Sequence, residues 1–124
     1  MSKIVSIIED DFTLSQLIQK KINQLETFKC NKTFITINEF MLTNEPADIL
    51  LLDINLPGTN GIDAIPVILN KYPNIIIVMN TIKDDVETIY KSLESGAIGY
   101  IDKQSFDDNI LEVLETVQNG CTVV

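Results

Sequence analysis

Short apolar runs that end abruptly in polar residues restrict how this chain can fold more than any other feature. The most apolar run, residues 49–52, contains only Ile and Leu, is closed by Asp53, and is followed by the turn sequence 56–61. Continuous aliphatic runs of this length are typical of strands buried on both faces of a sheet. The other runs end in a similar way: residues 4–8 lead into Glu9-Asp10-Asp11, residues 75–79 into Asn80-Thr81, and residues 100–102 into Lys103.

Segments of helical period separate these runs, and residues 33–36 add a further predicted strand. Pro66 is expected to kink the helix in which it lies or to confine that helix to its early turns. Strands that alternate with helices predict a parallel sheet covered on both faces, because each crossover must pack back onto the sheet. The predicted helices are residues 12–24, 37–43, 61–71, 86–95 with a stripe of Val86, Ile89, Tyr90 and Leu93 stopped by Gly96, and a last helix that begins at a capping box in 105–108 and ends at Gly120.

The composition fits one compact domain over residues 1–124 and excludes several functions. The formal net charge is −9, and all nine basic residues are lysines. An acidic chain of this kind is not expected to bind nucleic acid directly, because phosphate contacts need clustered basic side chains. Without His, the chain has no His-activated nucleophile and no His-ligated zinc, and without Arg it has no arginine finger of its own.

The remaining composition points to the cytoplasm. Cys30 and Cys121 match no metal-binding spacing and are interpreted as ordinary reduced thiols. The N-terminus looks like a strand and not like a signal peptide, and no apolar stretch approaches the ~20 residues of a membrane span. We therefore expect no membrane association.

Polar side chains at the strand ends predict a metal site. The carboxyl ends of parallel strands share one edge of the sheet, so Glu9, Asp10 and Asp53 should lie close together. Three neighbouring carboxylates need a counter-charge, and a hard cation with oxygen ligands and retained waters, such as Mg²⁺, would supply it. Asp11 is interpreted as the cap of the first helix and not as a ligand.

At the same edge, Asp53 is the candidate nucleophile. A carboxylate can attack a phosphoryl group and form an aspartyl phosphate. Lys103 can neutralise phosphoryl oxygens and Thr81 can donate a hydroxyl hydrogen bond, which suits a transfer that depends on positioning and charge stabilisation. Taken singly, Lys103 is also a plausible surface charge and Thr81 a plausible turn residue; their order together predicts phosphoryl chemistry.

Together these motifs resemble the receiver domain of bacterial two-component response regulators over essentially the whole chain. The resemblance rests on Glu9-Asp10 after the first strand, Asp53 followed by a Pro-Gly turn, Thr81, and the sequence 99–103. It implies a flavodoxin-like (βα)5 fold, a doubly wound five-stranded parallel sheet of order 2-1-3-4-5 with helices on both faces. The closing residues 119–124 resemble the stretch that leads to a helix-turn-helix output, so the chain is expected to be cut from a longer transcription regulator.

The resemblance also implies roles for individual residues. A sensor histidine kinase or a phosphotransfer protein would supply the phosphoryl group, and the domain would be a phosphoacceptor and not an enzyme with its own substrate. Two copies could pair through the last helix–strand–helix face. The implied roles are phosphoacceptor for Asp53, Mg²⁺ ligands for Asp10 and Asp53 by side chain, Glu9 through water and Asn55 through its backbone carbonyl, phosphoryl contacts for Thr81 and Lys103, and an aromatic switch for Tyr100.

Some residues depart from the family pattern and leave alternatives open. Ile82 stands where a small residue is usual and could crowd the approach to Asp53, which favours a degenerate receiver that acts only as a protein-interaction module. Gln104 stands where Pro is frequent, so a cis bond there is less assured. A small Mg²⁺-dependent phosphatase also uses a strand-end Asp, but its Asp-x-Asp pattern is interrupted here by Asn55.

Overall fold

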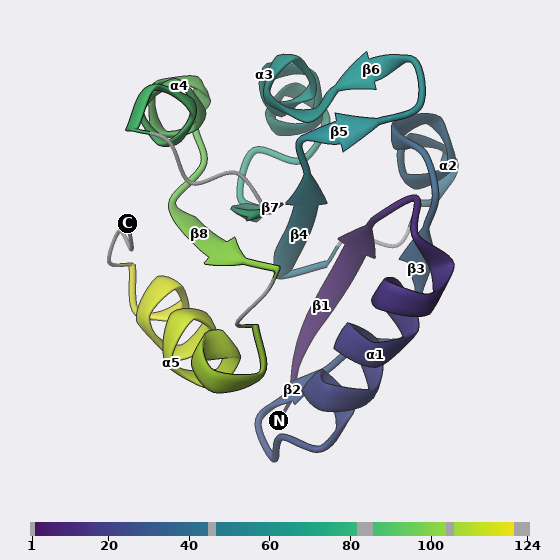
Figure 1. The fold of residues 1–124 in the computed structure, drawn as a ribbon, viewed down its shortest axis with the longest axis vertical. Helices are drawn as coiled ribbons and strands as arrows, with labels where there is room; N and C mark the ends of the chain where they lie inside the picture. Colours follow the sequence, from purple (N-terminus) through teal and green to yellow (C-terminus); the bar gives the residue numbers. More distant parts are fainter. Residues whose placement is uncertain (1, 45–46, 82–85, 104–105, 121–124) are drawn as a thin grey trace.

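The computed structural model describes residues 2–44, 47–81, 86–103 and 106–120. Its main element is a parallel sheet in which each long strand is followed by a helix (Figure 1). The long strands are β1 (Lys3–Ile8), β4 (Ile49–Asp53), β7 (Ile76–Thr81) and β8 (Gly99–Asp102), the short ones β2 (Phe28–Lys29), β3 (Thr33–Phe34), β5 (Asn55–Leu56) and β6 (Thr59–Asn60), and the helices α1 (Phe12–Asn23), α2 (Ile37–Leu42), α3 (Gly61–Lys71), α4 (Val86–Ser95) and α5 (Phe106–Gln118).

The strand order is β2-β1-β4-β7-β8, and β3 also pairs with β1. All of these pairings are parallel. The predicted order 2-1-3-4-5 is therefore confirmed. The second strand along the chain differs from the prediction. Two short strands, β2 and β3, take the place of the single strand expected over 33–36.

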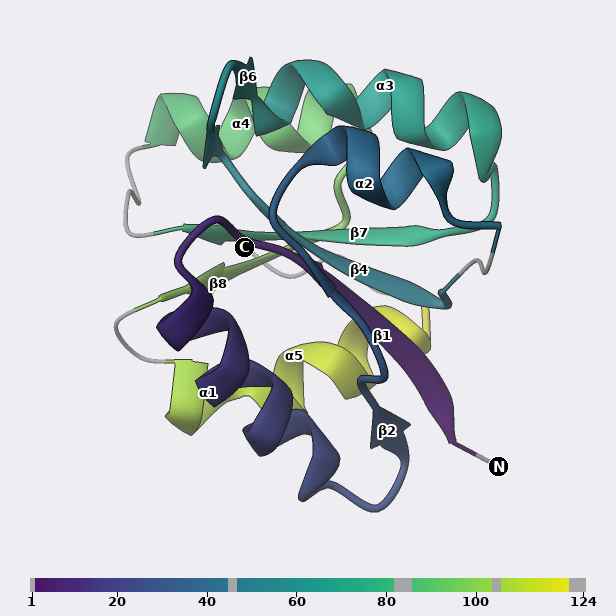
Figure 2. The same cartoon turned by 90° about the vertical axis from the view of Figure 1, so that its right-hand side faces the viewer.

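Helices cover both faces of the sheet, as the alternating sequence predicted. Figure 2 shows α1 and α5 on one face and α2, α3 and α4 on the other. Alternate strand residues pack into the two cores: Ile49 and Leu51 face the α1/α5 side, whereas Leu50 and Leu52 face the other. Burial on both faces explains why the central strand is apolar throughout.

The predicted helix boundaries are close to the observed ones. Two other expectations about the helices, concerning Pro66 and the apolar stripe of α4, differ from the structure. Helix α3 contains Pro66 and still continues to Lys71, so the expectation that Pro66 would confine the helix to its early turns is wrong. In α4 the predicted apolar stripe faces the sheet only in part, since Val86 is 82% and Tyr90 62% exposed. Gly96 follows α4 with φ 122°, a conformation that suits glycine and ends the helix. Ser105, the first residue of the predicted capping box of the last helix, lies outside the described residues.

A two-stranded hairpin links β4 to α3. Strands β5 and β6 are antiparallel, and Pro57 and Gly58 form the connection between them, with Gly58 at φ 73°. The sequence predicted a turn here but not the pairing. Asn60 then caps α3 by accepting a hydrogen bond from Ile62 N at 2.8 Å. Within the described ranges, none of the helices is both long and apolar enough to cross a membrane.

Candidate functional site

The carboxyl ends of the central strands bring the predicted polar residues to one edge of the sheet. Asp53 ends β4, Thr81 ends β7, and Glu9 directly follows β1. The register aligns these ends, because Asp53 is paired with Asn80 and Thr81 with Asp102. A cavity of about 380 Å³ opens at this edge, and its lining residues are Glu9, Asp10, Asp11, Leu14, Asp53, Asn55, Thr81 and Lys103.

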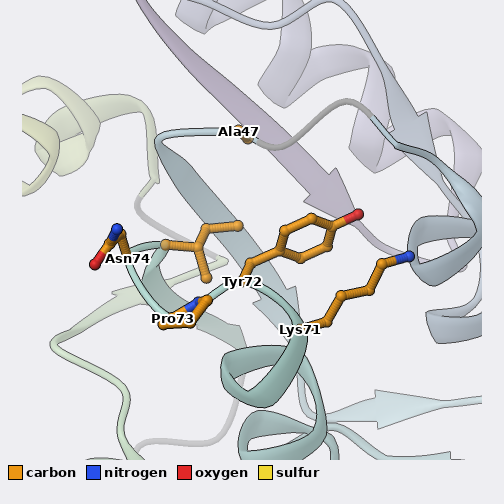
Figure 3. A pocket seen from close by; sticks show the side chains of 6 residues that line it. Ala47, Lys71, Tyr72, Pro73 and Asn74 are labelled. Atoms are coloured by element: carbon orange, nitrogen blue, oxygen red, sulfur yellow. The ribbon is translucent and has the colours of Figure 1, made fainter.

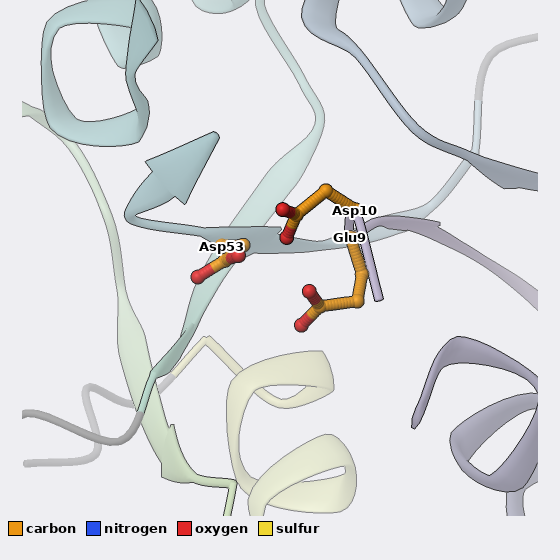
Figure 4. A group of neighbouring side chains, drawn as sticks. All are labelled: Glu9, Asp10 and Asp53. Atoms are coloured by element: carbon orange, nitrogen blue, oxygen red, sulfur yellow. The ribbon is translucent and has the colours of Figure 1, made fainter. Parts of the chain in front are cut away.

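Three carboxylates meet in this cavity. One oxygen each from Glu9, Asp10 and Asp53 lies within 4.8 Å of the others, and Figure 4 shows the three side chains converging from two strand ends. Glu9 is 1% and Asp53 2% exposed, whereas Asp10 is exposed. A set of oxygen donors alone is the donor chemistry that hard divalent cations prefer, so these residues fit such an ion.

Lys103 provides a positive charge inside the cluster. Its Nζ lies 2.5 Å from Glu9 Oε1 and 3.1 Å from Asp53 Oδ1, and the side chain is 12% exposed. The Lys103 backbone N–H donates to Thr81 O at 3.0 Å, which fixes the start of the lysine side chain beside the end of β7. One ammonium cannot balance three carboxylates, so the site retains an excess of negative charge.

The buried charges shift one another's protonation. Burial raises the pKa of Glu9 from 4.5 to about 7, although contacts from Lys103 and from Asp11 N–H oppose the rise. Burial also raises the pKa of Asp53 against the lowering effect of Lys103. For Lys103, burial alone would lower the pKa, but Glu9 and Asp53 more than offset it and the pKa is raised. Lys103 therefore stays charged, and Glu9 and Asp53 share it as their ion-pair partner.

Three hydrogen bonds from backbone N–H groups orient the acidic residues. Asp11 Oδ1 accepts from Leu14 N at 3.1 Å, and Asp11 N donates to Glu9 Oε2 at 3.1 Å. The interpretation of Asp11 as the cap of α1 is thus confirmed, and its carboxylate lies outside the three-carboxylate cluster. Asn55 N donates to Asp53 Oδ1 at 3.3 Å, which holds the Asp53 carboxylate toward the loop that follows β4.

Gly61 allows the chain to turn back against Asp53. A Cβ atom at this position would lie 2.0 Å from the Asp53 carbonyl oxygen, and Gly61 N donates to Ile54 O at 2.6 Å. The first turn of α3 therefore rests directly on the backbone that carries Asp53. The sequence showed this glycine only as part of a turn, and the close approach became visible only in three dimensions.

Thr81 lies at the cavity that contains Asp53, whereas Tyr100 does not. Thr81 is 1% exposed and lines the cavity from the end of β7. Tyr100 is half-buried and packs against the core under α2, α3 and α4, outside the lining of the cavity. Ile82 and Gln104, the departures noted in the sequence, lie outside the described residues.

Asn80 was not predicted as a site residue. It is 2% exposed, and both its Oδ1 and its Nδ2 lack a hydrogen-bond partner in the part of the chain that the structure describes. Its signal in the sequence is an amide residue one place before Thr81, at the end of a run that is otherwise apolar. A buried amide without a partner is rare in native proteins and calls for an explanation.

A second hollow lies at the amino ends of the strands and has a structural explanation (Figure 3). Lys71 Nζ donates to Met41 O, and Tyr72 Oη donates to Thr43 O at 2.6 Å. These carbonyls belong to the last turn and C-cap of α2, which otherwise would lack partners. The hollow therefore lies beside the contacts through which Lys71 and Tyr72, at the end of α3, hold the end of α2.

The fold is that of a doubly wound α/β protein, and the edge of its sheet carries a cluster of three carboxylates whose donor chemistry fits a divalent cation. Residues 5–115 match the family model for the response regulator receiver domain, and the chain belongs to this family. Members of this family are signalling domains of two-component systems.

Among curated proteins, the chain is 42% identical over 74 residues to the transcriptional regulatory protein MctR of Rhizobium johnstonii, covering 60% of this chain and 35% of that protein. It is 31% identical over 112 residues to the transcriptional regulatory protein CitT of Bacillus subtilis, covering 89% of this chain and 50% of that protein. The chain thus spans half or less of the length of these relatives.

Solved structures support the same fold. A two-component response regulator of the LuxR family from Aurantimonas superposes with a TM-score of 0.92 at 20% identity, covering 100% of this chain and 90% of that one. The non-phosphorylated receiver domain of RcsB from Escherichia coli superposes with a TM-score of 0.91 at 22% identity, covering 99% and 98%. The flavodoxin-like fold expected from the sequence is confirmed.

Proposed function

We propose that this domain is a phosphorylation switch that accepts a phosphoryl group on Asp53. The observation that carries the proposal is the Asp53 carboxylate itself, buried at the end of β4, 3.1 Å from Lys103 Nζ and clustered with Glu9 and Asp10. The family match supports the assignment. A similar solved structure, the isolated REC domain of RcsB from Salmonella enterica, was determined in the presence of the phosphomimetic BeF3⁻, which also supports it.

The transfer requires one bond to form and one to break. The Lys103 and Asn55 contacts both fall on Asp53 Oδ1, so we assign the attack to Oδ2. Oδ2 bonds to the phosphorus of a phosphohistidine, the P–N bond breaks, and the imidazole leaves and takes up a proton. Lys103 then stabilises the phosphoryl oxygens, and Thr81 donates its hydroxyl hydrogen bond to them.

The acidic cluster would hold Mg²⁺. Asp10 and Asp53 would bind it by side chain, Glu9 through a water and Asn55 through its backbone carbonyl. Bound there, the cation supplies the positive charge that lets an anionic carboxylate meet an anionic phosphoryl group. The chain's own part is to keep the three carboxylates together and to orient Asp53 through Asn55 and Lys103.

The switch would act through Thr81 and Tyr100. In the two-state picture, phosphoryl contacts to Thr81 stabilise a minor conformation in which Tyr100 turns inward. This changes the face formed by α4, β8 and α5, where Val86 and Tyr90 are already exposed. Contacts on this face, including pairing of two copies, would then depend on phosphorylation.

Membership of the receiver family supports proposals for the partners and the compartment. A sensor histidine kinase or a phosphotransfer protein would be the donor, and the cytoplasm is the proposed compartment. The matched curated proteins are named as transcriptional regulators and are at least about twice as long as the match, so we propose control of transcription through a further domain. The domain itself would be a phosphoacceptor that assists its own phosphorylation and dephosphorylation, and not an enzyme with a separate substrate.

Intact-mass spectrometry after incubation with acetyl phosphate and Mg²⁺ tests the proposal. We expect one phosphoryl adduct that requires Mg²⁺ and is absent from Asp53→Asn. Asp63→Asn, an exposed position in the first turn of α3, is the matched control and should keep the adduct. A wild-type chain that forms no adduct and does not respond to beryllofluoride would instead indicate an interaction module without phosphoryl chemistry.

A further inference from the structure

The unsatisfied amide of Asn80 lies next to the reacting carboxylate. In the register of the sheet, Asn80 is paired with Asp53 on one side and with Ile101 on the other. Strand residues alternate between faces, and Ile49, Leu51 and Val78 all pack on the α1/α5 side. By this alternation Asp53 and Asn80 project to the same face of the sheet and are neighbours across the β4–β7 pair, with Asn80 buried directly before the cavity-lining Thr81.

The Lys103 side chain crosses the part of β7 that carries Asn80. Strand β7 lies between β4 and β8, so a lysine that follows β8 reaches Asp53 only by crossing the carboxyl end of β7. Its backbone N–H is bonded to Thr81 O, the residue next to Asn80. The Lys103 ammonium thus ends close to a buried amide that has both an acceptor and two donors to offer.

In the structure as it stands, Lys103 is held by Glu9 and Asp53. The buried Asn80 amide therefore carries a desolvation penalty with no compensating hydrogen bond. Phosphorylation would change this balance, because a phosphoryl oxygen would draw Lys103 Nζ away from Glu9 and leave the remaining ammonium donors in need of other acceptors.

We propose that Asn80 is a positioning residue for the phosphorylated state: its Oδ1 accepts a hydrogen bond from Lys103 Nζ once Lys103 has moved onto a phosphoryl oxygen, and its Nδ2 donates to the carbonyl oxygen of phosphorylated Asp53. The amide is unsatisfied in the unloaded site and satisfied in the loaded one. Asn80 therefore shifts the equilibrium toward the phosphorylated conformation. This inference rests on the proposed function.

The test compares wild type with Asn80→Leu, which keeps the branching of the side chain and removes its polar atoms, and with Asn80→Ala, which fits without added bulk. Met79→Leu, on the opposite face of β7, is the matched control for repacking of the strand. Backbone-amide NMR titrations with Mg²⁺ alone and then with beryllofluoride in excess Mg²⁺ give both affinities and show that each variant is folded. Denaturant unfolding without ligand completes the set.

We expect Asn80→Leu to leave the unliganded unfolding midpoint unchanged or raised and the Mg²⁺ affinity unchanged. Its beryllofluoride affinity should fall about tenfold, which corresponds to the loss of one hydrogen bond to a charged group. Asn80→Ala should lose the same affinity, and Met79→Leu should lose none. An unchanged beryllofluoride affinity in both Asn80 variants, an equal loss of Mg²⁺ affinity, or a lower unliganded midpoint in Asn80→Leu overturns the inference. A wild-type chain that does not bind beryllofluoride overturns the proposed function itself, which is a separate result.

Discussion

Among single residues, Glu9 shows most clearly that ionising a buried carboxyl at this site lowers the stability of the fold. Its carboxyl is buried and shares Lys103 with Asp53. The folded-state pKa of about 7 lies above the ordinary value of 4.5, so between these two pH values the folded protein binds more protons than the unfolded chain. Protonated Glu9 is therefore the form that favours folding in the absence of a metal.

The pH dependence of stability follows from this sign. Without Mg²⁺, the free energy of unfolding should decrease as pH rises from about 4.5 to 7, by roughly 2–3 kcal/mol from Glu9. The raised pKa of Asp53 adds to the change in the same direction. Urea unfolding at pH 5 and pH 7.5 in EDTA measures it, and Glu9→Gln should flatten most of the slope. A stability that rises with pH over this range contradicts the prediction.

Lys103 should contribute to the stability of the unliganded protein, because it is the shared ion-pair partner of two buried carboxylates. Lys103→Met keeps the aliphatic stem and leaves Glu9 and Asp53 without their shared ammonium. We expect a loss of about 3 kcal/mol in the free energy of unfolding at neutral pH, because a buried charge is left uncompensated. Adding Mg²⁺ should restore part of it. Lys91→Met, which breaks an exposed pair with Glu87 on α4, is the control and should change stability by less than about 1 kcal/mol.

At the scale of elements, the two helices that begin at the site are tied to it in different ways. Helix α1 starts at the cap Asp11, which accepts from Leu14 N. Helix α3 starts at Gly61, which lies against the Asp53 backbone. A change at the start of α1 should therefore affect helix stability alone, whereas a change at the start of α3 should affect both stability and the site.

Asp11→Ala should lower the free energy of unfolding by about 1 kcal/mol, the usual cost of losing an N-cap. The Mg²⁺ affinity should change little, because the Asp11 carboxylate caps the helix and is not part of the three-carboxylate cluster. Denaturant unfolding and a Mg²⁺ titration on the same variant test both statements. A large loss of Mg²⁺ affinity in Asp11→Ala, comparable to that in Asp10→Ala, would make Asp11 a ligand.

Gly61→Ala should be far more damaging than its position in a helix suggests. The new Cβ would meet the Asp53 carbonyl oxygen at 2.0 Å, so α3 or the end of β4 must shift. We expect a loss of several kcal/mol and weaker Mg²⁺ binding, measured by thermal unfolding with and without the ion. Gly58→Asn is the matched control: φ is 73°, nothing lies within 4 Å, and Asn tolerates this conformation.

For the whole molecule, charge is the dominant quantity. The net charge of −9 works against compactness and against close approach of two copies at low salt. A divalent ion bound by the acidic cluster reduces the charge at the point where it is most concentrated. Binding only to the folded state should stabilise the protein by mass action.

We expect Mg²⁺ at about 100 times its dissociation constant to add about 2.7 kcal/mol to the free energy of unfolding. Differential scanning calorimetry in MgCl2, against NaCl of matched ionic strength, separates specific binding from screening. Asp53→Asn should lose most of the Mg²⁺ effect and keep the NaCl effect. Equal stabilisation by the two salts in the wild type would mean that screening alone is at work.

The amino-acid sequence by itself determined the order of strands and helices and the polar residue that ends each strand. This information is local, since an apolar run or a helical period is set by neighbours in the chain. It was enough to predict β4 and α3 with the observed bounds and to bring Glu9, Asp10, Asp53, Thr81 and Lys103 to one edge. The strand order itself came from the family resemblance and not from the pattern.

Only the tertiary structure decided the burial and the contacts of each of these residues. It buried Glu9 and left Asp10 exposed, joined Lys103 to two carboxylates, and turned Val86 and Tyr90 of α4 outward. It also paired Asn80 with Asp53 in the sheet and left the buried Asn80 amide without a hydrogen-bond partner among the described residues. Each of these outcomes depends on strand register and on packing between segments far apart in the chain. The energy of a buried charge or amide is set by such distant neighbours, so no local pattern could contain it.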